Sequence, residues 1–295
     1  MRGPSDIASV ECPGPSEIRV SLDRPLVIAG SGTGLVAASL LAEAFEQAFP
    51  GTRIAVHGGI GSAATLRAIS DGLLAVGLIS RSLRDGERSQ GLTVLPYARA
   101  AIVCVVHPAV AEDGVTSGDL LQIFRGAKTH WRDGREIVLL TREPGASSIE
   151  ALEQEIPGFT AVYQVSRLSK HSITLYSDQE VNRVLARTPA GLGFMDLGVL
   201  TTDQHLPVKA LRFNGVLPTP SNIRSGLYPL VKTLAFAFVR EKLSETAVTF
   251  LEYAQSKDGE KILWDNGYLP VAMGETRMTP EPPPMDGDAF GGKCG

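Results

Sequence analysis

Long apolar runs, cysteines and an excess of one charge are all scarce in this sequence of 295 residues. No stretch reaches about 18 consecutive apolar residues, which excludes a membrane-spanning helix and predicts a soluble protein. The 28 basic and 32 acidic residues give a net charge of −4, so the surface as a whole does not attract nucleic acid. An anion bound by this protein must therefore be held by a local group of residues.

The three cysteines are too few for a small scaffold held together by disulfides. Cys104 lies in an apolar run and is predicted to be part of the core, whereas a bridge between Cys12 and Cys294 is left open. Residues 1–24 and 274–295 are rich in proline and poor in apolar residues, so we expect a flexible N-terminal tail and a disordered C-terminal tail. The N-terminus lacks the pattern of a secretory leader, which implies either a cytoplasmic protein or a leader already removed.

Several catalytic signatures are also missing. The sequence contains no CxxC, no HExxH and no cluster of histidines and aspartates that would hold a metal ion. It contains no G-x-S-x-G of a serine hydrolase, and the Lys128-Thr129 pair lacks the upstream glycine of a Walker loop. We therefore predict no metal, no cofactor and no catalysis of these kinds.

Short apolar runs alternate with helical patterns between residues 25 and 271. Apolar residues at helical spacing occur around Phe45, Leu66 and Phe250 and in a stripe at 120–124. Thr116 or Ser117 would cap the helix of this stripe, which would end near Gly126. The alternation predicts an α/β fold with mainly parallel sheets. The predicted strands are Leu26–Ala29, Arg53–His57, Leu74–Ile79, Ala101–Val106, Ile137–Leu140, Ala161–Val165, Leu192–Met195 and Leu234–Val239.

Three of these strands end in short turns of glycine, serine and threonine that lead into helices. The turns are AGSGTG at 29–34, GGIGS at 58–62 and TREPGASS at 141–148, and in the third Ser147 and Glu150 have the spacing of a capping box. A helix N-terminus presents unpaired N–H groups and about half a positive charge. Three such turns around one point predict a site for a single tetrahedral anion.

Two arginines add positive charge at the ends of strands. Ser80 and Arg81 follow the predicted strand 74–79, and Arg142 follows the strand 137–140. Ligands collect at the carboxyl ends of strands in open α/β sheets, and a guanidinium suits bidentate contact with phosphate-like oxygens. Both arginines are therefore candidate anion ligands.

Four segments of the chain resemble the PstS family of ABC-transporter phosphate-binding proteins. They are NGVLPTPSNIRSGLYPL at 214–230, IFRGAKTHW at 123–131, TPAGLGFMDLG at 188–198 and GYLPV at 267–271. The resemblance covers residues 25–271 and implies the two-lobed α/β fold of type II periplasmic binding proteins. In that fold each lobe is a mixed sheet flanked by helices, and the ligand cleft lies between the lobes. It implies lobe I at 25–105 plus 207–273 and lobe II at 106–206, hinged by two strands.

The resemblance also implies roles for individual residues. In lobe I, the turn formed by Ser31, Gly32 and Thr33 would donate to the anion, and Ser62 would cap the second helix and donate as well. In lobe II, Arg142 would be the charged ligand. Ser147 and Ser148 stand in the family's hydroxyl-bearing turn, with Ser148 the better donor. Ala146 replaces the expected serine and removes one donor.

Arg81 stands where some family members have an aspartate that accepts the proton of hydrogen phosphate, while other members carry Ser-Arg there. Such a carboxylate separates protonated phosphate from sulfate, which has no proton to give. Its absence leaves phosphate, arsenate and sulfate open as ligands. Glu143 is an alternative acceptor if it turns inward, and His171 and Asp178 could also reach the cleft from the loop 166–179, whose place the sequence does not give.

The resemblance implies an exported binding protein, periplasmic or extracellular, that captures inorganic phosphate or a related tetrahedral oxyanion. It would act without catalysis, as a monomer, and hand its ligand to the membrane permease of an ABC transporter. An oxyanion sensor without a transport role is an alternative. An NADP-dependent oxidoreductase is another, because Gly59, Gly61 and Ala64 match G-x-G-x-x-A and Arg81 follows about 20 residues on.

Overall fold

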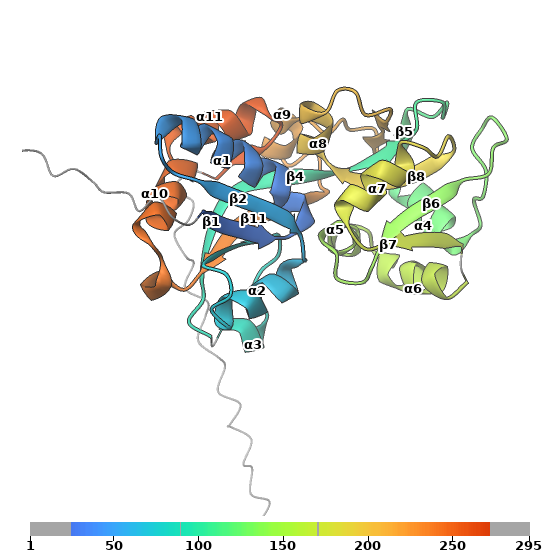
Figure 1. The fold of residues 1–295 in the computed structure, drawn as a ribbon. Coiled ribbons are helices and arrows are strands. Elements are labelled where there is room, and N and C mark those ends of the chain that lie inside the picture. Colours follow the sequence, from blue (N-terminus) through green and yellow to red (C-terminus); the bar gives the residue numbers. More distant parts are fainter. Residues whose placement is uncertain (1–24, 89, 170, 272–295) are drawn as a thin grey trace, which may run out of the picture.

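The computed structural model describes residues 25–88, 90–169 and 171–271, and Figure 1 shows their arrangement. The predicted tails and the residues Cys12 and Cys294 lie outside these ranges. The strands are β1 Leu26–Gly30, β2 Ile54–Gly59, β3 Val76–Ile79, β4 Thr93–Val106, β5 Gly114–Val115, β6 Val138–Arg142, β7 Ser172–Leu175, β8 Gly191–Asp196, β9 Lys209–Ala210, β10 Arg212–Phe213, β11 Val231–Phe238 and β12 Leu269–Pro270.

The helices alternate with these strands along the chain. They are α1 Leu35–Ala48, α2 Ser62–Ser70, α3 Asp85–Arg88, α4 Ser117–Arg125, α5 Ser147–Glu155, α6 Phe159–Ser169, α7 Asp178–Leu185, α8 Leu197–Thr202, α9 Pro220–Arg224, α10 Glu245–Ala254 and α11 Lys257–Asp265, with short 3-10 turns η1 Gly32–Gly34 and η2 Arg240–Lys242. The predicted α/β class is therefore confirmed.

The strands form a sheet in the order β2-β1-β3-β11-β4-β8-β6-β7, with β9 and β12 paired to β4. Pairing is parallel from β2 to β3 and from β8 to β7, but β11 and β4 run antiparallel to their neighbours. The expectation of mainly parallel sheets is wrong for this central region. The reason is that β4 and β11 carry the chain between the two halves in opposite directions, which makes the sheet mixed.

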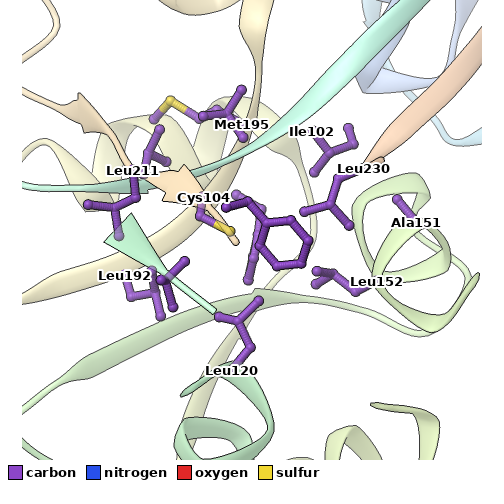
Figure 2. Packing of buried hydrophobic residues seen from close by; sticks show 14 of the residues in the cluster. Ile102, Cys104, Leu120, Ala151, Leu152, Leu192, Met195, Leu211 and Leu230 are labelled. Carbon is purple, nitrogen blue, oxygen red and sulfur yellow. The ribbon is translucent and has the colours of Figure 1, made fainter. Parts of the chain in front are cut away.

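Three hydrophobic cores lie in the two lobes, two of them in the lobe that contains β1 to β3 and the third in the other lobe, and β4 runs from one lobe to the other (Figure 1). In one lobe α1 and α11 lie on one side of the sheet and α2 and α3 on the other (Figure 1). The other lobe buries Cys104 completely among Leu120, Leu192 and Leu211 (Figure 2), which confirms its predicted place in the core. The two-lobed architecture implied by the resemblance is confirmed.

The segment 207–230 packs with the second lobe. Its apolar side chains Leu211, Phe213, Tyr228 and Leu230 belong to the core that also contains Cys104. In addition, β9 pairs with Val105 and Val106 of β4, and β10 pairs with β5. The sequence division placed this segment in lobe I, and the placing of the lobe boundaries stays a prediction.

The predicted cap of α4 has its expected form. The Thr116 side chain accepts the N–H of Asp119, the Asp119 carboxylate accepts the N–H of Thr116, and Gly126 ends the helix in the left-handed conformation. Such reciprocal bonds satisfy N–H groups that a helix start leaves unpaired. The start and end of this helix were therefore readable from sequence.

The predicted strand Ala161–Val165 is wrong, because these residues lie inside α6. The side chains of Phe159, Val162, Tyr163 and Ser166 are buried, which is the i, i+3, i+4, i+7 spacing of a helix face. The strand of this region is β7 instead, at the edge of the sheet. The other seven predicted strands overlap observed ones.

Across residues 25–88, 90–169 and 171–271, no helix is both long and apolar enough to cross a bilayer. The same residues contain no group of three or more histidines, cysteines and acidic residues arranged to hold a metal ion.

Candidate functional site

A polar cavity of about 110 Å³ lies between the lobes, where the three strand-to-helix turns meet. The first turn follows β1, the second joins β2 to α2, and the third joins β6 to α5. Residues between β7 and α7 close a further side. The lining residues are Ser31, Gly32, Gly59, Ile60, Gly61, Ser62, Ser80, Arg142, Glu143, Gly145, Ala146, Ser147, Glu150, Tyr176, Ser177 and Asp178.

The lobe I wall of the cavity is a linked group of serines. The hydroxyls of Ser31 and Ser80 lie 2.7 Å apart, and the Ser80 N–H donates to the Ser62 hydroxyl at 3.3 Å. Gly30 allows this close packing, because a Cβ there would lie 2.2 Å from the Leu78 carbonyl oxygen and its φ is +155°. The wall therefore presents hydroxyls beside the first N–H groups of α2, which have no acceptor within the helix.

The lobe II wall combines a helix start with a guanidinium. Arg142 is the last residue of β6, and α5 begins at Ser147 after its N-cap Ala146. The Ser147 hydroxyl forms a hydrogen bond with the Thr33 hydroxyl of the other lobe. The two walls thus meet directly at the edge of the cavity, and the N-terminus of α5 adds its positive end to the same space.

Arg142 is bound by two carboxylates. Its Nε and Nη2 donate to the two oxygens of Glu143, each at 2.9 Å, and its Nη1 donates to Oδ1 of Asp178. Burial lowers the pKa of the guanidinium, but the bonds to Glu143 and the charge of Asp178 outweigh it, so the net shift is upward. Burial also raises the pKa of the Asp178 carboxyl, and Arg142 does not cancel the effect. Arg142 stays cationic in this environment.

Glu150 is the remaining acidic residue of the lining, and it forms ion pairs with two basic side chains that do not line the cavity. Its carboxylate lies 3.3 Å from the Nζ of Lys232 on β11 and 3.8 Å from Arg84. Lys232 is itself buried. The charge of Glu150 is therefore compensated by residues outside the cavity, unlike the charges around Arg142.

Seven of the ten residues predicted to bind the ligand line this cavity, and three do not. The seven are Ser31, Gly32, Ser62, Ser80, Arg142, Ala146 and Ser147. Of the other three, Thr33 directs its hydroxyl to Ser147, and Ser148 buries its hydroxyl without a hydrogen-bond partner among the described residues. Arg81 turns to Glu87, which it binds through two bonds of 2.7 and 2.8 Å.

Arg81 lines a second, larger cavity of about 670 Å³, which shares Ser80 and Glu150 with the first. Its guanidinium also donates to the Ser82 carbonyl at 2.8 Å. Every group that Arg81 contacts in this way belongs to its own lobe. The two candidate arginines are therefore separated, and one guanidinium faces the anion cavity.

Both predicted serine caps are wrong. Gly61 and not Ser62 is the N-cap of α2, and Ala146 and not Ser147 is the N-cap of α5, neither with a side-chain bond. Each serine is the first helical residue, so its hydroxyl is free of the helix and faces the cavity. The Ser147 and Glu150 spacing misled because the Glu150 carboxylate bonds Lys232 instead of closing a capping box.

The loop before α7 contributes residues that the sequence could not place. Tyr176, Ser177 and Asp178 line the cavity, whereas His171 packs against Gly126 at the end of α4. The signal for Asp178 was an acidic residue after a serine N-cap, which is common in helices generally. Only the tertiary fold shows that this helix start faces the turn around Gly32.

Comparison with known proteins gives the same picture of the fold. The family profile described as PBP superfamily domain matches residues 16–258. The phosphate-binding protein PstS of Bacillus subtilis (strain 168) is 27% identical over 253 residues, which cover 83% of this chain and 80% of that protein. The predicted resemblance to the PstS family is confirmed.

Two solved structures share the fold. A phosphate ABC transporter substrate-binding protein from Clostridium perfringens with bound phosphate superposes with a TM-score of 0.74 at 22% identity, covering 84% of this chain and all of that one. An ABC-type phosphate transport receptor from Vibrio cholerae superposes with a TM-score of 0.60 at 23% identity, covering 83% of this chain and 99% of that one. With the family profile spanning most of its length, this chain belongs to the family of PBP superfamily domains.

Proposed function

We propose that this protein captures inorganic phosphate, or a related tetrahedral oxyanion, between its two lobes for uptake by an ABC transporter. The observation that carries the proposal is the cavity of about 110 Å³, in which three strand-to-helix turns, several hydroxyls and the Arg142 guanidinium converge. Each of these groups donates hydrogen bonds, which is what an oxyanion requires. The relative from B. subtilis is a phosphate-binding protein.

The protein acts as a binding protein without catalysis in this proposal. The ligand residues are Ser31, Gly32, Ser62, Ser80, Arg142 and Ser147, with Ala146 supplying backbone only, while Thr33 bonds Ser147 across the cleft. Arg81 is not a ligand in this proposal, because its guanidinium is paired with the Glu87 carboxylate. The same bond removes the guanidinium that the NADP-dependent oxidoreductase alternative needs.

A ligand panel tests the proposal. Thermal unfolding is measured with phosphate, arsenate, sulfate, molybdate and NADPH, because a ligand that binds only the folded state raises the melting temperature. We expect phosphate and arsenate to raise it and NADPH to leave it unchanged. An unchanged melting temperature with every oxyanion, confirmed by calorimetric titration, would refute the proposed function.

We further propose that the protein is exported and meets its permease as a monomer in the periplasm or at the cell surface. Lobe I would comprise 25–100 and 232–271 and lobe II 101–231, which follows the membership of the three cores except at Leu269, a residue of the lobe II core. Light scattering of the purified protein tests the monomer, and a mass near twice 31.4 kDa would contradict it.

A further inference from the structure

We propose that the cleft accepts, besides inorganic phosphate, phosphate monoesters of small polyols, with the phosphoryl group in the anion cavity and the polyol in the larger cavity beside it. The inference rests on the proposed function, because the phosphoryl group would occupy the site described for phosphate. It is carried by the second cavity, by a buried lysine in its lining and by the charges around it.

The second cavity adjoins the anion cavity, because Ser80 and Glu150 line both spaces. Its volume is about 670 Å³, against about 110 Å³ for the anion cavity. Sites for small organic molecules occupy roughly 300–1,000 Å³. A phosphoryl group bound by the three turns would therefore have room for a substituent on the side that faces Ser80 and Glu150.

Contacts across the cleft show that the second cavity persists while the lobes touch. The hydroxyls of Thr33 and Ser147 form a hydrogen bond between the lobes. The ammonium of Lys232 on β11 lies 3.3 Å from the Glu150 carboxylate on α5. The space therefore belongs to a form in which the lobes are in contact, and inorganic phosphate is too small to fill it.

The lining of the second cavity is part apolar and part polar. Most of its apolar side chains come from the two strands that join the lobes, which are Val94 and Pro96 on β4 and Val231 and Ala235 on β11. Its polar side chains come mainly from the segment after β3 and from α5. A polyol presents C–H groups as well as hydroxyls, so it can pack on the first set and form hydrogen bonds with the second.

Lys232 places a buried cation in this lining. Its side chain is 4% exposed, and among the described residues its Nζ donates to Glu150 at 3.3 Å. An ammonium has three N–H donors, and a buried charge is costly unless it is well paired. A single long bond to one carboxylate leaves donors for a ligand, and a hydroxyl oxygen can accept from them.

The charges around the second cavity favour neutral hydroxyls over a second anion. Lys232 and Arg84 share the carboxylate of Glu150, and Glu153 adds another carboxylate to the lining. Carboxylates accept hydrogen bonds from hydroxyls but repel a second phosphoryl group. Because Glu150 lines both cavities, it can accept from the hydroxyl nearest to the ester oxygen.

A nucleotide suits this space less well than a polyol. None of the described residues that line the second cavity is aromatic, so a base would find no ring on which to stack. The mixture of carboxylates, a buried ammonium and apolar strand residues therefore favours a ligand whose organic part carries hydroxyls.

Calorimetric titration of wild type at pH 7 with inorganic phosphate, glycerol 3-phosphate and propyl phosphate tests the proposal. The two esters have the same number of carbon atoms, with and without hydroxyls. We expect glycerol 3-phosphate to bind at least as tightly as phosphate. We expect propyl phosphate to bind about tenfold more weakly than glycerol 3-phosphate, because the bonds to Glu150 and Lys232 are missing.

Thr233→Trp tests the second cavity alone. Thr233 is an exposed residue of β11 that lines the second cavity and not the first. An indole there takes up the space of the polyol, and aromatic residues suit strands. We expect the affinity for glycerol 3-phosphate to fall at least tenfold more than the affinity for phosphate.

Ile173→Trp is the matched control, because Ile173 is an exposed strand residue on β7 that lines neither cavity. We expect it to keep the wild-type ratio of the two affinities. Should Thr233→Trp fail to fold by thermal unfolding, Lys232→Met is measured instead, since it removes the ammonium and keeps an unbranched side chain. The same change of ratio is expected.

Three results would overturn the inference: a wild type that binds phosphate at least about tenfold more tightly than glycerol 3-phosphate, propyl phosphate binding as tightly as glycerol 3-phosphate, or Thr233→Trp changing the ratio no more than Ile173→Trp does. A wild type that binds none of the three ligands would instead refute the proposed function. The two failures are therefore distinguishable in one experiment.

Discussion

Arg81 and Arg142 occupy similar positions in the sequence pattern but lie in different environments in the structure. Each lies at or just after the end of a parallel strand, beside a turn that leads toward the cleft. Arg81 forms a bidentate pair with Glu87, on the next short helix of its own lobe. Arg142 faces the cavity, held by Glu143 and by Asp178 from a different element.

The difference shows that the position of the partner carboxylate determines whether an arginine at a strand end stabilises its own loop or faces the cavity. The pair between Arg81 and Glu87 has its charge balanced within one loop and stabilises that loop. The cluster around Arg142 has two carboxylates, Glu143 and Asp178, and both line the cavity. Variants that remove one member at a time separate a stabilising pair from a binding cluster.

Arg142→Ala is expected to have the largest effect, with phosphate affinity lowered more than tenfold. The variant loses a charged hydrogen-bond donor, at a cost of about 1.5–3 kcal/mol, and leaves two carboxylates unpaired in the cavity. Calorimetric titration measures the affinity. Arg81→Ala serves as the control, and equal losses in the two variants would show that the arginines do not differ in role.

Asp196→Asn examines a buried carboxylate that accepts a hydrogen bond from a neutral backbone N–H. Its Oδ1 accepts the Gly198 N–H at 2.6 Å, and burial raises its pKa to about 7. Below its ordinary pKa of 3.8 the group is protonated in both states; between about pH 4 and 7 the folded state alone holds the proton. The stability of wild type should therefore fall as pH rises through this window, by up to about 1.4 kcal/mol per pH unit.

In Asp196→Asn this contribution disappears, while the amide oxygen can still accept from Gly198. Denaturant unfolding at pH 4, 5, 6 and 7 measures the difference. If the free energies of unfolding of wild type and variant differ by the same amount at all four pH values, Asp196 is not the source of the pH dependence.

Arg81→Ala is expected to lower stability by about 1 kcal/mol at pH 7 and to leave phosphate affinity within about twofold. The hydrogen bond from Arg81 lowers the pKa of Glu87 to about 2 from its ordinary 4.5. The pair therefore stabilises the fold above pH 4.5, and the difference between wild type and variant should shrink as pH falls toward 2. A difference that grows on acidification would disprove the pairing.

Ser62→Ala is expected to have the smallest effect, a loss of phosphate affinity of about two- to tenfold, since one neutral hydroxyl is removed from the cavity wall. Ser70→Ala on the same helix is the control, because its hydroxyl bonds the Leu66 carbonyl at the helix end. Equal affinities of the two variants would place Ser62 outside the site.

Much of the fold was predictable because local patterns and tertiary packing agree. Thr116 and Gly126 delimit α4 as expected, and the strand-to-helix turns meet at one cavity. The run Ala161–Val165 was predicted as a strand because its β-branched and aromatic residues favour strands. The helical spacing of the buried residues is visible only over the longer segment from Phe159 to Ser166.

The site was predictable in its turns and less so in its charges. A glycine-rich turn binds an anion through its backbone N–H groups, which are present wherever the sequence forms that turn. The places of Ser31 and Gly32 in the cavity lining were therefore predictable. The direction of Arg81 depends on Glu87, and the place of Asp178 depends on how α7 packs near η1. These are contacts between distant or independently placed groups, which a local pattern does not encode.

The insertion of β11 between β3 and β4 has a consequence for how the polypeptide is made. On the ribosome, β1 to β3 emerge early, but β3 lacks its neighbour β11 until Phe238 has left the exit tunnel. Closing such long loops slows folding, so we expect nascent chains stalled before Val231 to be cleaved by protease within residues 25–80 and chains released after Val271 to resist. The first strands would thus still be unfolded when most of the chain has been translated.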